Sequence, residues 1–281
     1  MPFNHQRLTG LVRPVLGPPV RRLRREAQWL PLRRSLAHKR IAEPLPHVAA
    51  RHHTPLIRVL AGVDPVLQRN KVVNLRLAVD RLDGVLLKPG QTLSFWRLVG
   101  PPRARRGFVD GLVLDHGHVS VGIGGGLCQL TNLIFWMTLH TPLEVRERWR
   151  HSYDVFPDSS RSQPFGSGAT CAWPSLDLQI ANPTGTTFRL SLAVGEADLI
   201  GEWTCETSPQ VVYVIEERNH RFTHEAPGAY FRHNELWRLE RPIRDGSVVE
   251  RMIAENHALV MYEPFLGPAT SQVVGLTSAS C

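Results

Sequence analysis

The chain has 281 residues, 42% of them hydrophobic, and carries a formal net charge of +8. Its length allows one large domain or two small ones, and its apolar content is sufficient for a packed core, so we expect a folded protein. No run of about 20 apolar residues occurs, so no transmembrane helix is expected. The N-terminus lacks the apolar stretch of a secretory signal, so we expect a cytoplasmic protein, with a peripheral position at the inner face of the membrane as the alternative.

The positive charge is concentrated at the N-terminus. Residues 1–40 contain ten basic residues and one acidic residue, Glu26, so the rest of the chain is close to neutral. Residues 21–37 fit a basic helix broken by a proline, and four prolines between positions 14 and 31 interrupt any long amphipathic face. We therefore expect residues 1–48 to be a solvated, partly ordered arm. The alternative is weak contact of residues 1–40 with an anionic membrane; nucleic acid is not an expected partner.

The pattern of apolar residues predicts an α+β fold, with helices early and antiparallel strands late. One helix is expected over Asn70–Leu82, and a second, buried helix over Leu127–Leu139. Strands are expected at Val85–Leu87 and Thr92–Leu98, followed by a hairpin from Phe108 to Val121. Later strands are expected at Glu144–Trp149, Tyr153–Phe156, Ala169–Trp173, Leu176–Ala181, Thr187–Val194, Ile200–Cys205, Val211–Glu216, Tyr230–Glu240 and Val248–Ile253. We divide the chain into the basic arm 1–48, a core domain 49–206 and a β-rich C-terminal extension 207–281.

The segment most suggestive of chemistry is the glycine-rich turn before the second helix. Gly124, Gly125 and Gly126 precede Leu127, Cys128 and Gln129. Such a turn exposes backbone N–H groups at a helix start, where they favour an anion. A thiol in the first helical turn ionises more easily, and the thiolate is the nucleophile. The same N–H groups can hold an oxyanion.

A nucleophilic thiol needs a base, and His151 is the candidate. It follows Cys128 by one helix and one strand, a distance that can return it to the helix start. Asp154 or Asp177 would orient the imidazole, which gives the Cys–His–acid order of papain-like enzymes. The competing interpretation is structural: a small buried thiol before an apolar helix and a histidine satisfied within the fold.

Other kinds of site are less favoured by the sequence. The four cysteines form no CxxC pair, so neither a structural zinc site nor another metal site is expected, and we expect no cofactor. His52-His53 is more typical of a solvated pair than of a metal site. The loop from Gly100 to Gly107 carries Arg103, Arg105 and Arg106, which could hold an anionic ligand beside the glycine turn.

Two motifs resemble those of the VanW family of glycopeptide-resistance accessory proteins. They are the segment Pro89-Gly90-Gln91-Thr92-Leu93-Ser94-Phe95-Trp96 and the segment Gly124-Gly125-Gly126-Leu127-Cys128-Gln129. Further matching residues occur at Lys71–Leu75, Leu139–Leu143, His151, Asp177 and Asn182, so the resemblance covers roughly residues 65–205. It implies a link with glycopeptide resistance and cell-wall metabolism.

The resemblance and the residues together suggest two functions. One is a cysteine-dependent hydrolase or acyl/peptidyl transferase that uses Cys128 and His151. The other is a binding module without turnover, in which the glycine turn, Gln129 and the arginines hold an anionic cell-wall precursor or a peptide. The family usually has an aspartate where this chain has Gly168. If that aspartate orients the histidine, Asp154 or Asp177 must replace it here, or the chain is not a catalyst.

Overall fold

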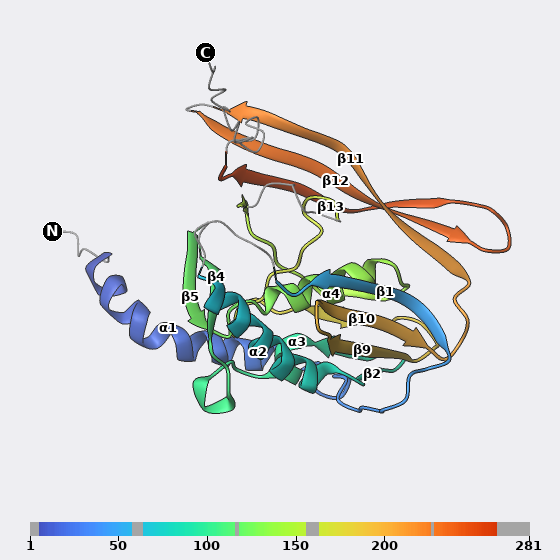
Figure 1. Cartoon of the computed structure of the whole chain (residues 1–281), viewed down its shortest axis with the longest axis horizontal. Helices are drawn as coiled ribbons and strands as arrows, with labels where there is room; N and C mark the ends of the chain where they lie inside the picture. Colours follow the sequence, from blue (N-terminus) through green and yellow to red (C-terminus); the bar gives the residue numbers. More distant parts are fainter. Residues whose placement is uncertain (1–5, 58–63, 116–117, 156–162, 226–227, 263–281) are drawn as a thin grey trace, which may run out of the picture.

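The computed structural model describes residues 6–57, 64–115, 118–155, 163–225 and 228–262. The fold is α+β, as predicted, with mainly antiparallel sheets. Figure 1 shows a body of helices packed around a four-stranded sheet, from which a second sheet of long strands projects. None of the helices in the described ranges is both long enough and apolar enough to cross a membrane.

The central sheet is the four-stranded sheet of the body. Its strands are ordered β1 (His47–Pro55), β10 (Asp198–Cys205), β9 (Phe188–Val194) and β2 (Leu86–Leu87), and all neighbours are antiparallel. Strand β1 was not predicted: its pattern of basic and small residues lacks regular apolar alternation, and its pairing with β10 comes from far along the chain.

Two helices pack against the central sheet. Helix α4 (Cys128–Leu139) contacts β1 and β10, and helix α2 (Pro65–Leu82) contacts β9. Contact at β10 is close because Gly201 has no side chain; an added Cβ there would lie 2.6 Å from the Met137 methyl carbon. The predicted buried helix is thus confirmed as α4, and its side chains at Leu130, Leu133 and Ile134 are fully buried.

Helix α2 confirms the predicted helix and begins five residues earlier. Asp64 caps it, because its carboxylate accepts a hydrogen bond from the Val66 N–H at 2.8 Å, and Pro65 occupies the first turn. At the other end the Asp83 N–H donates to the Val79 carbonyl, and Gly84 follows with φ of 81°. The helix therefore ends at the turn formed by Asp83 and Gly84.

Two predicted strands differ from the structure. Residues 92–98 divide into β3 (Thr92–Ser94) and the short helix α3 (Phe95–Val99), because the Ser94 hydroxyl accepts from the Arg97 N–H and caps a helical turn. The segment 169–173 forms no regular strand; it makes only isolated bridges, from Thr170 to Trp149 and from Ala172 to Leu176.

Smaller elements complete the body around α4. A three-stranded sheet has the order β3, β8 (Gln179–Ala181) and β6 (Glu144–Glu147). The predicted hairpin is confirmed as β4 (Asp110–Asp115) and β5 (His118–Ile123), which follow the 3-10 turn η1 (Ala104–Arg106).

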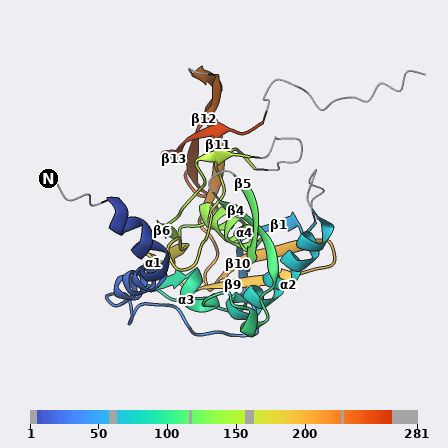
Figure 2. The ribbon, with the colours of Figure 1, turned by 90° about the vertical axis from the view of Figure 1, so that its left-hand side faces the viewer.

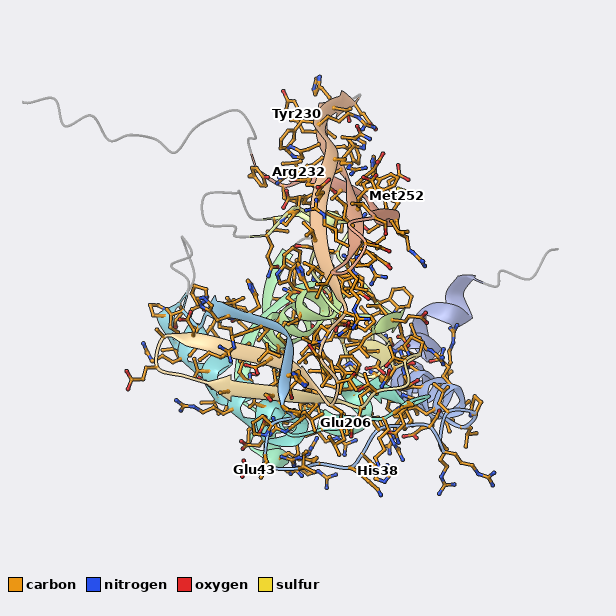
Figure 3. The ribbon with its side chains drawn as sticks, turned by 90° about the vertical axis from the view of Figure 1, so that its right-hand side faces the viewer. His38, Glu43, Glu206, Tyr230, Arg232 and Met252 are labelled. Carbon is orange, nitrogen blue, oxygen red and sulfur yellow. The ribbon has the colours of Figure 1, made fainter. Side chains whose placement is uncertain are left out.

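The projecting sheet is built from β11 (Val211–Glu225), β12 (Ala229–Pro242) and β13 (Val249–Val260). These strands are longer than predicted, because pairing continues through polar segments that carry no alternating apolar pattern. Strand β7 (Tyr153–Asp154), which follows His151, pairs in parallel with β13. Figure 2 shows this sheet standing above the body, and Figure 3 places Tyr230, Arg232 and Met252 on it, far from His38 and Glu43.

The N-terminal segment is a continuous helix, α1 (Gln6–Trp29), rather than an interrupted arm. Its C-terminal half is fixed to the body, since Arg25 and Trp29 are buried. The Arg25 guanidinium makes two hydrogen bonds of 2.7 Å to the Glu147 carboxylate, and the Trp29 indole N–H donates to the Ser94 hydroxyl. The prediction of a solvated arm missed this anchoring, because the partners of Arg25 and Trp29 lie far along the chain.

Candidate active site

The turn before α4 requires glycine because its backbone is crowded and partly left-handed. Gly124 and Gly126 have positive φ values of 80° and 90°. Gly125 lies against β4, where an added Cβ would be only 2.1 Å from the carbonyl carbon of Gly111. Any side chain at Gly125 would therefore separate the turn from the hairpin.

A buried asparagine fixes the position of this turn. The Asn74 side-chain amide, on α2, donates to the Gly125 carbonyl at 2.9 Å and to the Val109 carbonyl at 3.0 Å. Its oxygen accepts from the Val109 N–H at 2.9 Å. Helix α2, the hairpin and the glycine turn are thus held together by one fully satisfied side chain.

Helix α4 begins at Cys128 with unpaired backbone donors. The Gln129 N–H donates to the Gly126 carbonyl at 3.1 Å, which closes the first turn. Within the described ranges, no backbone carbonyl accepts from the N–H groups of Gly126, Leu127 or Cys128. These donors and the helix dipole make the start of α4 favourable for negative charge.

Three residues from outside α4 surround the Cys128 sulfur. The Thr170 hydroxyl lies 3.8 Å from Cys128 Sγ and 2.5 Å from His151 Nε2. The Cys171 carbonyl oxygen lies 3.7 Å from the same sulfur. Both cysteines are half-buried and neither is in a disulfide. The nucleophile and the base expected from the sequence therefore belong to one cluster.

This environment makes Cys128 the acidic thiol of the pair. Its pKa lies well below the ordinary value, first because of the hydrogen bond with the Cys171 thiol. Burial opposes this shift, whereas hydrogen bonding and charge from His151 reinforce it. The pKa of Cys171 is raised well above its ordinary value by its hydrogen bond to Cys128 and by burial. Cys128 is thus the thiol of the pair that loses its proton first, and Cys171 is the weaker acid.

The strand-like segment that carries Thr170 is fixed to α4 and to its neighbour. The Thr131 hydroxyl donates to the Ala169 carbonyl at 2.6 Å, and the Ala169 N–H donates to Asn132 Oδ1 at 2.5 Å. The Thr170 N–H donates to the Trp149 carbonyl at 2.7 Å. Consequently the Thr170 hydroxyl is presented to the helix start by three backbone contacts.

Comparison with known proteins places these residues in a family. The family model described as VanW like protein matches residues 70–204. A vancomycin B-type resistance protein VanW of Enterococcus faecalis is 32% identical over 219 residues, which are 78% of this chain and 79% of that protein. The chain belongs to the VanW family. An uncharacterized protein YoaR of Bacillus subtilis is 28% identical over 112 residues, 39% of this chain and 34% of YoaR. No solved structure matches the chain significantly.

The match to the VanW model includes every residue of the cluster and also Gly168, where this chain lacks the expected aspartate. Gly168 is packed beside α4, because an added Cβ would lie 3.0 Å from Asn132 Oδ1. Its carbonyl accepts from Arg148 Nε at 2.9 Å. The Arg148 guanidinium lies 4.4 Å from the Phe135 ring, and burial lowers its pKa to about 10, so it remains cationic at neutral pH.

The two acids that the sequence offered as partners of His151 are engaged elsewhere. Asp177 is fully buried and accepts from the Ser94 hydroxyl at 2.6 Å and the Trp96 N–H at 2.9 Å. Asp154 accepts from Arg232 at 3.2 Å, in the projecting sheet. The partner that the structure gives His151 is Thr170, so the imidazole is held by a hydroxyl.

The proposed ligand-binding side chains are also partly occupied. The Gln129 amide donates to the Thr54 hydroxyl and to the Pro55 carbonyl, each at 2.9 Å, and so joins α4 to β1. Arg106 donates to the Val99 and Pro101 carbonyls and holds its own loop. Arg103 stays half-exposed in the loop beside the glycine turn, where an added Cβ on Gly124 would meet the Pro102 ring.

Sequence reasoning missed Thr170 and Cys171. Thr170 lies two residues after Gly168, in the loop where the family usually has an aspartate, and a threonine there carries no catalytic signal of its own. Cys171 gave no signal, because it has no cysteine close in sequence. The residues in the described ranges form no group of three or more histidines, cysteines and carboxylates that could hold a metal.

Proposed function

We propose that this VanW-family protein is a cysteine-dependent hydrolase or acyl/peptidyl transferase with Cys128 as nucleophile. The observation that supports it is the placement of Cys128 Sγ at a helix start, with a depressed pKa, beside the linked Thr170 and His151 side chains. A helix start, a base and a positioned hydroxyl around one thiol are the parts that thiol-based acyl transfer needs.

The reaction begins with transfer of the Cys128 proton to His151. The thiolate attacks a carbonyl carbon of a peptide or amide, and the carbonyl oxygen becomes negative. The unpaired N–H groups of Leu127 and Cys128 are the available donors for that oxyanion. His151 returns the proton to the leaving nitrogen, directly or through the Thr170 hydroxyl, as the C–N bond breaks. The resulting thioester passes its acyl group to water in a hydrolase, or to a second amine in a transferase.

We infer the substrate class from the name of the similar Enterococcus protein. The name of the Enterococcus protein links it to vancomycin resistance. We therefore propose a peptide of the cell wall, or the peptide part of a cell-wall precursor, as the acyl donor. The half-buried position of Cys128 suits a chain that reaches the sulfur from one side.

The first test is the reactivity of the thiol. Iodoacetamide should alkylate Cys128 at about pH 6 at least ten times faster than it alkylates glutathione, because a thiol with an ordinary pKa of about 8.5 is almost wholly protonated there. Mass spectrometry of the peptides assigns the modified residue, and Cys205→Ser is the control variant. A rate equal to that of glutathione would remove the basis of the proposal.

The second test asks for the covalent intermediate. An activated p-nitrophenyl ester of an N-acylated dipeptide should acylate the protein once, at Cys128, and the adduct should decay by hydrolysis or by added amine. Cys128→Ser should give no thioester. Acylation at surface lysines alone would contradict the assigned nucleophile.

The alternative, a binding module for an anionic precursor, uses the same glycine turn without turnover. It is less well supported because Gln129 and Arg106 are bonded within the chain. Complementation of a host that depends on this protein separates the two functions: Cys128→Ser preserves function in a binding module and abolishes it in the enzyme.

A further inference from the structure

Helix α1 has one face that is anchored and an opposite face that is apolar and exposed. Arg25 and Trp29 form the anchored face and are 3% and 4% exposed. On the opposite face Val20 and Leu23 are 58% and 69% exposed, and Ala27 continues the same stripe at helical spacing. Such a stripe normally faces a core, so its exposure calls for another surface.

The stripe continues past the end of the helix. Leu30, three residues after Ala27, is 65% exposed. Helix α1 projects from the side of the body (Figures 1 and 2). The stripe lies opposite the buried Arg25 and Trp29, so it faces away from the body. A partner can therefore reach the stripe from the solvent side of α1.

Exposed arginines lie on α1 and directly after it. At about 100° per residue Arg24 borders the stripe, whereas Arg21 and Arg22 lie nearer the anchored face. Arg21, Arg22 and Arg24 are exposed on α1, and Arg33 and Arg34 follow Leu30. The only acid among residues 1–40 is Glu26, which lies 4.0 Å from Arg22 and 4.0 Å from Arg97. The C-terminal half of α1 and the segment after it are thus strongly cationic, with Arg24 next to the aliphatic stripe.

We propose that this face of α1 docks the protein on an anionic lipid surface. Aliphatic side chains would enter the boundary between head groups and acyl chains, while the arginines bind lipid phosphates. A second copy of the chain is disfavoured as occupant, because two such faces would bring their arginines together. A nucleic acid would meet the arginines but gain little from the exposed Leu23 and Val20. The inference is independent of the proposed catalysis.

Sedimentation of the full chain with vesicles tests the proposal. The protein should bind vesicles of equimolar phosphatidylglycerol and phosphatidylcholine and should not bind phosphatidylcholine alone. Leu23→Gln should weaken the partition coefficient by about ten-fold, because one buried leucine is lost. The combined change Arg21→Gln, Arg22→Gln and Arg24→Gln should weaken it on the order of a hundred-fold, at about five-fold per arginine near an anionic surface.

Matched controls separate this face from general charge and hydrophobicity. Val121→Gln removes an exposed apolar side chain on β5, 58% exposed against 69% for Leu23. The combination Arg69→Gln, Arg76→Gln and Arg251→Gln makes the same change in net charge at exposed positions away from α1. Both controls should bind vesicles within about two-fold of the unchanged protein, because neither alters the docking face. All variants change exposed residues, and unaltered thermal unfolding confirms that they fold.

Three results would overturn the proposal. The first is no binding to the anionic vesicles. The second is vesicle binding that Leu23→Gln does not weaken, which would make the contact purely electrostatic. The third is a different occupant: a dimer in sedimentation equilibrium that Leu23→Gln dissociates, or binding of a DNA duplex with equal affinity and no effect of Leu23→Gln.

Discussion

The Thr170 hydroxyl lies between the two groups expected to perform chemistry, 2.5 Å from His151 Nε2 and 3.8 Å from Cys128 Sγ. A single hydroxyl can thus accept from one group and donate to the other, so it joins the base to the nucleophile. In the proposed mechanism this hydroxyl replaces the acid that the sequence suggested, because Asp177 is bonded to Ser94 and Trp96 instead.

Replacing Thr170 tests this relationship. Thr170→Val keeps the shape of the side chain and removes the hydroxyl, whereas Thr170→Ser keeps the hydroxyl. We expect Thr170→Val to slow alkylation of Cys128 at about pH 7 by roughly ten-fold, the equivalent of one hydrogen bond to a charged group. Thr170→Ser should react within about two-fold of the unchanged protein. Equal rates for all three proteins would show that the hydroxyl has no part in activating the sulfur.

The hydrogen bond between the two thiols sets a pH dependence. Because the pKa of Cys128 is held well below its ordinary value, the alkylation rate should rise with pH through a midpoint below about 8.5. Cys171→Ala removes the first cause of that shift, so the midpoint should move to higher pH and the rate at neutral pH should fall. Cys205→Ala, which changes a buried thiol in β10, should leave the profile unchanged. A midpoint that stays in place in Cys171→Ala would contradict the role assigned to Cys171.

The elements with local signals were predictable from the sequence. Helix α4 combines a glycine turn with a continuous apolar run, and α2 has an acidic cap, a proline and a terminal glycine. The segment around Ser94 shows the limit of such reasoning. Its apolar residues fit a strand, but the serine hydroxyl caps a helical turn, and Asp177, from the loop before β8, fixes the backbone there.

Only some residues of the candidate site could be predicted from the sequence. Cys128 follows from the glycine turn, and His151 follows from its distance along the chain. Thr170 and Cys171 reach the sulfur because Thr131 and Asn132 hold the segment at Ala169, and these contacts have no local sequence signal. The anchoring of α1 also has no local sequence signal, because Arg25 bonds Glu147, which lies 122 positions further along the chain.

Mild oxidation should join the two cysteines. With about one equivalent of hydrogen peroxide, Cys128 would form a sulfenic acid and one water, and attack by Cys171 would release a second water and leave a disulfide. We expect a mass loss of two hydrogens, a cross-linked peptide pair and loss of iodoacetamide reactivity, all reversed by dithiothreitol. In Cys171→Ser the sulfenic acid should persist and be trapped by dimedone. Further oxidation of Cys128 to sulfinic acid in the unchanged protein, without the disulfide, would show that the thiols do not reach each other.

Disrupting the close contact between the glycine turn and β4 should lower the free energy of unfolding by a measurable amount. Gly125→Ala would place a methyl group 2.1 Å from the Gly111 carbonyl carbon, so the turn must move. We expect a loss of several kcal/mol in the free energy of unfolding, at the upper end of overpacking costs of about 1–3 kcal/mol or beyond it. Gly185→Ala is the matched control: nothing lies within 4 Å of an added Cβ there, and the change should be within about 0.5 kcal/mol of neutral. Urea denaturation measures both. Equal stability of the two variants would contradict the packing described for the turn.

The ion pair between Arg25 and Glu147 should contribute far more than its exposed counterpart between Arg51 and Glu202. Arg25 is 3% exposed and bonds Glu147 twice at 2.7 Å, whereas Arg51 is 66% exposed. Arg25→Met should cost about 3–5 kcal/mol of unfolding free energy, because it leaves carboxylates buried without their cation. Arg51→Met should cost less than about 1 kcal/mol.

The two variants should also differ in their dependence on pH. Burial by itself raises the pKa of Glu147, but the bonds from Arg25 and its neighbours hold it below the ordinary value, and Arg25 also restrains the upward shift that burial gives Asp177. Without Arg25 the pKa of each carboxyl should rise above its unfolded value. A group whose folded pKa is raised favours folding at low pH and loses that contribution as pH increases through the folded pKa. The deficit of Arg25→Met relative to the unchanged protein should therefore shrink as pH falls from 7 towards about 4, and the deficit of Arg51→Met should stay small throughout. A deficit for Arg25→Met that is constant over this range would show that the buried carboxyls do not depend on the arginine for their charge.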